Sequence, residues 1–209
     1  MRSGRGGLHV VLAAALAVVA AGAPAASSAA TAPPPAAAKG IAGLKRTDGF
    51  IPFYWDAARG RVLLEISQFD TDVLYYVQAA TGGGSVELPF DRGVLDSEVI
   101  RFERVGQRVL VNEVNLDYRS INGDAAHAAN TTASFPTSVL AVLPIEDEAD
   151  GHVVVDATAL FMRDAANVEG RLKQAKQGAY KFDAARSTFY PAKMKAFPEN
   201  TEIETQVTY

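Results

Sequence analysis

IRFERVGQRVLVNEVNLDY, residues 100–118, is the stretch that decides the predicted fold. It contains two strand-like runs, 100–105 and 108–118, which are joined by Gly106-Gln107. Such runs around a short glycine turn are typical of a β-hairpin. Apolar and polar residues alternate at the end of the second run, with apolar positions at Val114, Leu116 and Tyr118. A period of two predicts one buried and one solvated face.

The same pattern extends outward along the chain. Further strands are expected over residues 50–54, 61–67 and 73–79, with turn residues at 56–60 between the first two. Another hairpin is expected from 138–145, an acidic turn 146–151 and 152–156. Its last strand contains the continuous run Val153-Val154-Val155, which predicts burial on both faces.

Two short helices interrupt this predicted series of strands. Asp156 can cap a helical turn that contains Leu160 and Phe161. Val168, Leu172 and Ala175 have helical spacing, and Gly178 is the expected stop. The predicted fold class is therefore mainly β (α+β), a meander of antiparallel hairpins with one or two short helices.

The C-terminal residues 201–209 also predict a strand. Ile203, Thr205, Val207 and Tyr209 share one face of a period-two segment, which continues to the last residue. This pattern suggests a piece of a longer protein, cut at or inside an element. It also predicts that residues 201–209 form an exposed sheet edge, which promotes association.

The N-terminus predicts export. Arg2 and Arg5 precede an apolar run over 10–21, and small residues follow in A-x-A-like order. This order is typical of a secretory signal peptide, and the run is short for a retained membrane anchor, the alternative. We assign residues 1–30 to the signal peptide, 31–44 to an Ala/Pro-rich linker and 45–209 to the β-rich domain. The expected location is periplasmic or extracellular, with no stable membrane span after cleavage.

Composition excludes several functions. The chain has 209 residues and no cysteine, so it has neither a disulfide framework nor a thiol nucleophile. Without residues 1–30, 18 basic and 24 acidic residues remain. Nucleic-acid affinity depends on phosphate contacts, so an acidic chain without a basic stripe is a poor nucleic-acid binder.

Candidate catalytic and metal-binding residues do not form a motif. His127 and His152 lack a second histidine at helical spacing, so both are interpreted as surface residues, His127 in an Ala-rich loop after Gly123 and His152 at the start of a strand. A weak hydrolase alternative pairs Ser134 with His127, although no G-x-S-x-G elbow surrounds the serine. The other polar clusters are interpreted as turns, a flexible connection or chance matches: Gly82-Gly83-Gly84, the possible calcium turn 146–150, Asp70 with Asp72, Asp91 with Asp96, and the glycosylation triplet at Asn130. We therefore assign no catalytic, cofactor-binding or metal residue.

Asp-Ala-Ala-Arg occurs twice, at 56–59 and 183–186, after an aromatic residue each time. A reused hairpin turn is the interpretation, since two short copies do not define a repeat protein.

Several short phrases occur in a characteristic order: Leu63–Ile66, Phe90–Gly93, Phe102–Gly106, Ser134-Phe135 with Ser138–Leu140, Val154–Thr158 with Phe161 and Asp164, and Ala196–Glu202. In this order the chain resembles, over roughly residues 45–209, the uncharacterised N-terminal domain of a family of large exported bacterial zinc-dependent metalloproteases. The resemblance implies an H-E-x-x-H-x-x-G-x-x-H zinc site downstream, in a catalytic domain that this sequence lacks. No zinc ligand or catalytic residue can therefore be assigned here.

The resemblance implies a non-catalytic accessory domain, which would pack on its own or a separate metallopeptidase catalytic domain and either support its folding or help to present a peptide substrate. The alternative is a stand-alone exported binding or structural module. The coding sequence beyond Tyr209 distinguishes the two hypotheses.

Overall fold

The computed structural model describes residues 9–17, 40–80, 93–118, 124–135, 137–149 and 151–209. Its described part is mostly strand, which confirms the predicted fold class. The strands are β1 His9–Ala17, β2 Arg46–Thr47, β3 Phe53–Asp56, β4 Arg61–Ile66, β5 Val73–Ala79, β6 Gly93–Val105, β7 Arg108–Glu113, β8 Ser138–Ala149, β9 His152–Asp156, β10 Thr188–Phe189, β11 Lys195–Ala196 and β12 Asn200–Thr208. The helices are α1 Ala125–Ser134, α2 Thr158–Phe161 and α3 Val168–Gln174, with short 3-10 turns η1 Ala184–Arg186 and η2 Pro191–Lys193.

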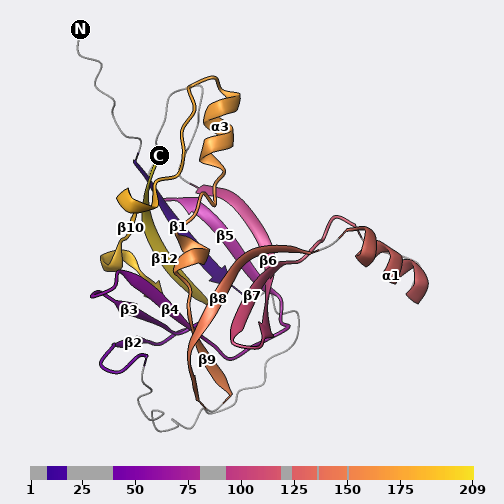
Figure 1. The fold of residues 1–209 in the computed structure, drawn as a ribbon, viewed down its shortest axis with the longest axis horizontal. Coiled ribbons are helices and arrows are strands. Elements are labelled where there is room, and N and C mark those ends of the chain that lie inside the picture. The colour runs from indigo at the N-terminus through magenta and orange to yellow at the C-terminus, as the bar shows by residue number, and fades with distance from the viewer. Residues whose placement is uncertain (1–8, 18–39, 81–92, 119–123, 136, 150) are drawn as a thin grey trace.

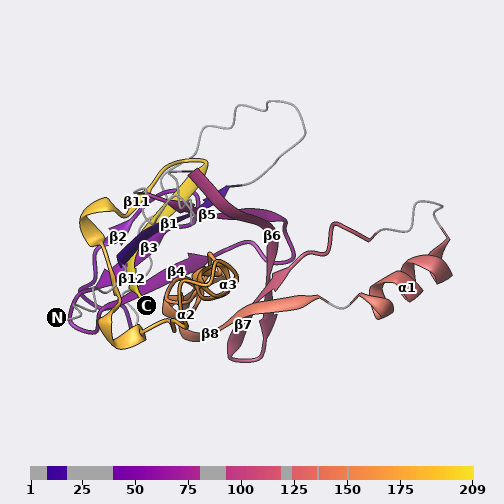
Figure 2. The ribbon, with the colours of Figure 1, turned by 90° about the horizontal axis from the view of Figure 1, so that it is seen from above.

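The strands form one curled antiparallel sheet in the order β10-β12-β1-β5-β6-β7-β8-β9-β4-β3-β2. α2 packs against β4 and β8 on the inner side of the curl. α1 extends away from the sheet on an arm between β7 and β8, as both views show (Figures 1 and 2). The core fills the curl with side chains from the inner faces of the strands, including Phe102, Val109, Leu143 and Ile203.

The hairpin at the centre of the predicted fold is confirmed by β6 and β7. Val105 pairs with Arg108, and Gly106 adopts φ 60° in the turn between them. The predicted length of the second strand is wrong, because β7 ends at Glu113 and the side chains of Leu116 and Tyr118 are 47% and 54% exposed. The carboxamide of Asn115 accepts hydrogen bonds from the backbone amides of residues 117 and 118, and this local turn competes with the strand.

The second hairpin is also present, but its predicted acidic turn is wrong. β8 continues through the acidic residues, so that Asp147 pairs with Val154 and Glu148 with Val153. Only the end of the predicted turn, near Gly151, lies outside the strands. The prediction of burial on both faces of β9 is confirmed, since all three valines of 153–155 are buried. Val154 packs with Tyr54 and Leu63 in a small cluster outside the main core.

α1 occupies residues that were interpreted as an Ala-rich loop, so that interpretation is wrong. Asp124 caps this helix, and its Oδ1 accepts from the amide of Ala126 at 2.8 Å. Ala125, Ala126, Ala128 and Ala129 then favour helix over loop.

The two predicted helices form as α2 and α3. α2 contains Leu160 and Phe161 as expected, and both are buried. Asp156 accepts from the amide of Thr158, but the N-cap residue of α2 is Ala157. Val168 and Leu172 are likewise buried. The predicted stop at Gly178 is too late, because the helix ends at Gln174 and Lys176 already adopts φ 56°. The amide of Gln177 donates to the carbonyl of Leu172, which is a backbone ending that does not require glycine at that position.

The repeated Asp-Ala-Ala-Arg sequence has one local function in two settings. Asp56 accepts from the amide and guanidinium of Arg59, and Asp183 accepts from the same groups of Arg186. Only the first copy is a hairpin turn, between β3 and β4; the second forms η1, so the interpretation of a reused hairpin turn is wrong there.

The predicted C-terminal strand is β12, and its inner face is buried. The expected exposed edge is wrong for this structure, because β12 pairs with β1 on one side and with β10 and β11 on the other. β1 itself lies within residues 1–30, which were assigned to the signal peptide.

Candidate functional site

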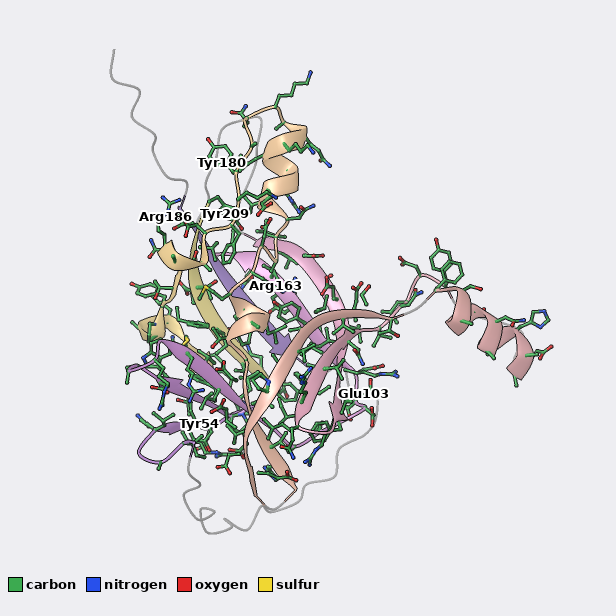
Figure 3. All side chains as sticks on the ribbon, in the orientation of Figure 1. Tyr54, Glu103, Arg163, Tyr180, Arg186 and Tyr209 are labelled. Atoms are coloured by element: carbon green, nitrogen blue, oxygen red, sulfur yellow. The ribbon has the colours of Figure 1, made fainter. Side chains whose placement is uncertain are left out.

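A polar cavity of about 330 Å³ lies where the α1 arm leaves the sheet. The structure brings together residues from four parts of the chain to line it: Asp70 before β5, Arg101 and Glu103 on β6, Asn112 on β7, and Thr131, Phe135 and Thr137 from α1 to the start of β8. Figure 3 shows Glu103 on the sheet below the base of this arm. Residues between 70 and 137 thus converge on one concave surface.

The floor of the cavity offers hydrogen-bonding groups of both kinds. Arg101 forms an ion pair with Asp72, and that contact holds the pKa of the Asp72 carboxyl below its usual range. The amide of Asn112 donates to Glu103 at 2.6 Å. These side chains leave further donor and acceptor positions, since a guanidinium has five N–H groups and a carboxylate about four acceptor sites. Such a floor suits a ligand that carries both donors and acceptors.

An aromatic pair closes one side of the cavity. The rings of Tyr118 and Phe135 are stacked, with centroids 3.8 Å apart and planes within 1°. Both side chains are exposed, and each flanks the α1 arm in sequence. The pair therefore ties the two ends of the arm together and presents an apolar edge next to the polar floor.

A separate charged cluster surrounds Glu65 on β4. This carboxylate is 8% exposed and accepts from Arg46, from the Tyr54 hydroxyl at 2.9 Å and from the ring of His152 at 3.0 Å. The hydrogen bond from Arg46, with those of Tyr54 and His152, lowers the pKa of Glu65 to about 2. Burial, together with this carboxylate, raises the pKa of Tyr54 to about 12. The cluster is fully paired, so we assign it to stability.

Two of the four acidic residues considered as a calcium turn, Glu146 and Glu148, are paired with arginines; Asp147 accepts from the amide of Glu148, and Asp150 lies outside the described residues. Glu146 contacts Arg61, which also contacts Asp56 and Asp156. Glu148 binds Arg104 through two hydrogen bonds of 2.6 and 2.7 Å. These cations occupy the oxygens that a calcium ion would need.

The weak Ser134–His127 hydrolase alternative is not supported by geometry. Both residues lie on α1, seven positions apart, which corresponds to about 10 Å along a helix axis. His127 contacts Asp124 at 2.9 Å instead. Both histidines are exposed, as predicted, although the ring of His152 also contacts Glu65 at 3.0 Å.

The remaining candidates lie in several settings. Asp72 pairs with Arg101, and Asp70 adopts φ 53° at the cavity rim. Asp96 accepts from the amide of Ser97, while Asp91 and Gly82-Gly83-Gly84 lie outside the described residues. Within the described ranges, no group of three His, Asp or Glu side chains could hold a metal ion. Among those residues, too, no helix has the length and apolarity needed to cross a membrane.

Sequence reasoning missed the cavity. Its strand residues are single polar positions on one face of neighbouring strands, and the helix that contributes Thr131 was interpreted as a loop. Asp124 before an alanine-rich run was the signal that could have identified the helix.

The fold and the cavity define a curled, antiparallel β-sheet domain with a polar surface pocket. A family model described as "Domain of unknown function (DUF5117)" matches residues 93–209, more than half of the chain, so the chain belongs to this family. Neither the curated proteins nor the solved structures contain a match.

Proposed function

We propose that this chain is a non-catalytic accessory domain of an exported, zinc-dependent metalloprotease-like protein. The observation that carries the proposal concerns the short sequence segments on which the family resemblance is based. Where the structure describes these segments, their residues pack in the core or make hydrogen bonds that hold the fold together.

Asp164 is the clearest case. Its carboxylate accepts from the amides of Val168 and Glu169, at 2.7 and 3.0 Å, and from the hydroxyl of Tyr209 at 2.7 Å. Asp164 therefore joins the start of α3 to Tyr209. Figure 3 shows Tyr209 near the lower end of α3. A carboxylate with these three donors is positioned for structure and not for proton transfer.

Thr201 has the corresponding role in the last phrase. Its hydroxyl accepts from the amide of Ile51 at 3.1 Å and donates to the carbonyl of the same residue at 2.8 Å. Phe102 and Val155 from the other phrases are buried in the core. These phrases therefore supply the scaffold of this domain, and a scaffold beside a protease domain would serve folding, docking or substrate presentation.

The cavity supplies a place for presentation. A polypeptide carries alternating N–H and C=O groups, which match the mixed donors and acceptors of Arg101, Glu103 and Asn112. The exposed ring of Tyr118 could cover an apolar side chain of the same ligand. The cavity equally favours the alternative, a stand-alone exported binding module, because both hypotheses use a binding surface.

Two measurements test the proposal. First, the coding sequence beyond Tyr209 is read for an in-frame H-E-x-x-H motif; a stop codon followed by an unrelated gene would favour the stand-alone module. Second, binding of fluorescein-labelled casein to the purified chain is measured by anisotropy. We expect Tyr118→Ala to weaken binding. Tyr190→Ala, which removes a tyrosine of similar exposure just before η2, should leave it unchanged. Equal binding by both variants would exclude the cavity as the polypeptide site.

A further inference from the structure

β1 fills a position between two well-anchored strands. It pairs over nine residues with β12 and over six with β5, and it runs antiparallel to both (Figure 1). In the described part of the chain, β5 and β12 do not pair with one another, so each would have a free edge without β1. Free edges expose unpaired backbone N–H and C=O groups and are ready to accept another strand.

The same residues belong to the N-terminal segment that we expect signal peptidase to remove. Cleavage near residue 30 would take β1 away and open a slot between β5 and β12. We call this position the β5/β12 slot, lined by Val73–Ala79 and Asn200–Thr208.

The inner face of the slot specifies apolar residues. The inward side chains of β12 and β5 are all buried: Thr201, Ile203, Thr205 and Val207 on β12, and Val73, Tyr75, Val77 and Ala79 on β5. In β1 the positions opposite the β12 row are Val10, Leu12, Ala14 and Leu16, and the last three also lie opposite β5. An occupant of the slot therefore needs uncharged apolar residues at every second position.

The other face specifies positive charge. Glu202 and Glu204 lie two residues apart on that face of β12. On the β11 side Lys195 is already paired with Glu202, whereas on the slot side the opposite positions are Ala15 and Ala13. Burial and the charge of Glu202 raise the pKa of the Glu204 carboxyl, while nearby Lys193 opposes this shift. Alanine offers no countercharge, and opposite charges on paired strands are favourable. The register therefore offers an incoming strand one position opposite each glutamate where a basic residue would be favourable.

We propose that the β5/β12 slot is a strand-acceptor site, which His9–Ala17 fills in the precursor and which then receives an extended strand of a partner polypeptide. That strand runs antiparallel to β5 and β12, with apolar residues inward and basic residues opposite Glu202 and Glu204. This is recognition by strand addition, in which backbone hydrogen bonds give affinity and alternate side chains give specificity. The proposal depends on the proposed export in one respect, because cleavage of the signal peptide is the step that would remove β1.

The test starts from the full chain with a specific protease site inserted between Ala17 and Gly40, so that it does not depend on signal peptidase. After folding and cleavage, fluorescent peptides are added and exchange for the N-terminal fragment is followed by anisotropy and native mass spectrometry. The probe has the sequence of His9–Ala17 with Ala13→Lys and Ala15→Lys, plus a polar tail. Its controls are the unsubstituted sequence and the same probe carrying Ala14→Asp, at the position opposite Ile203.

We expect the lysine probe to replace the fragment and to bind about tenfold more tightly than the unsubstituted peptide. The Ala14→Asp peptide should not bind. The gain from lysine should disappear in the double variant Glu202→Gln/Glu204→Gln, which keeps the shape of both side chains. Export is tested separately, by determining the N-terminal residue of the secreted protein. That measurement shows whether the signal peptide is cleaved and does not depend on whether the slot binds a strand.

Three results would overturn the proposal. The fragment could leave without any peptide taking its place. All three peptides could bind equally, which would indicate non-specific association. The chain could form a dimer of twice the mass with exchanged N-terminal segments, which would make a second copy the occupant.

Discussion

The Glu65 cluster gives a prediction whose size and pH dependence both follow from the structure. Folding lowers the pKa of this carboxyl from 4.5 to about 2. A shift of this size corresponds to about 3 kcal/mol of stability at neutral pH. Arg46, the main cause, is partly exposed to solvent, which screens its contribution. We therefore expect Glu65→Gln to lower the free energy of unfolding by about 2 kcal/mol at pH 7.

The sign of the pH dependence is fixed by the lowered pKa. Folding favours the ionised form, so the contribution of Glu65 is complete above the unfolded value of 4.5. It decreases as the pH falls towards about 2, where the folded protein also takes up the proton. The difference between wild type and Glu65→Gln should thus be less than roughly half as large at pH 3 as at pH 7.

Urea unfolding at pH 7, 4 and 3 measures this difference for both proteins, provided that their m-values agree. Glu148→Gln is the matched control, because Glu148 also binds an arginine through two hydrogen bonds but lies at the surface. We expect no measurable change for the control. A loss that is the same at pH 7 and pH 3 would show that Glu65 acts through packing, and the electrostatic reasoning would be refuted.

Three further predictions follow from other contacts. Asp164→Ala should cost about 2 kcal/mol in urea unfolding, because it leaves two helix amides and the Tyr209 hydroxyl without their acceptor, and Tyr209→Phe should cost about half as much; equal costs would contradict this ranking. Gly49→Ala should lower the melting temperature, because a Cβ there would lie 2.4 Å from the Cβ of Ala196 and 2.9 Å from its carbonyl carbon; an unchanged melting temperature would refute the clash. From the proposed accessory role we expect no chelator-sensitive cleavage of casein by the purified chain with added zinc, and such cleavage would refute that role.

The strands could be predicted because their signals are local. Alternation over Ile203 to Tyr209 and the glycine turn at Gly106 depend only on neighbours in sequence. The errors occur where a short polar contact decides the outcome. The side chain of Asn115 accepts from the amide of Asp117, and this turn ends β7. The side chain of Asp124 accepts from the amide of Ala126 and starts α1, which the alanine-rich sequence alone did not predict. The acidic strand end at 146–149 was taken for a turn because its partners, Arg61 and Arg104, lie on other strands.

The candidate site was harder to predict than the fold. Arg101, Glu103 and Asn112 each occupy an ordinary polar position on a strand, and only the pairing of β6 with β7 places them together. Tyr118 was expected in a strand, on its buried face, yet it stacks on Phe135 across the arm. A stacking partner 17 residues away has no signature in a period-two pattern, so the cavity required the structure.

β1 shows how one segment satisfies two demands at once. Export requires an uncharged apolar run. The slot requires apolar residues only at every second position, opposite Thr201, Ile203 and Thr205. Ala13→Lys with Ala15→Lys separates the two, because it breaks the apolar run but places cations opposite Glu204 and Glu202. We expect this variant to stay in the cytoplasm on cell fractionation, yet to unfold at a higher urea concentration than wild-type precursor. Normal export of the variant would contradict the signal peptide, and a lower unfolding midpoint would contradict the charge preference of the slot.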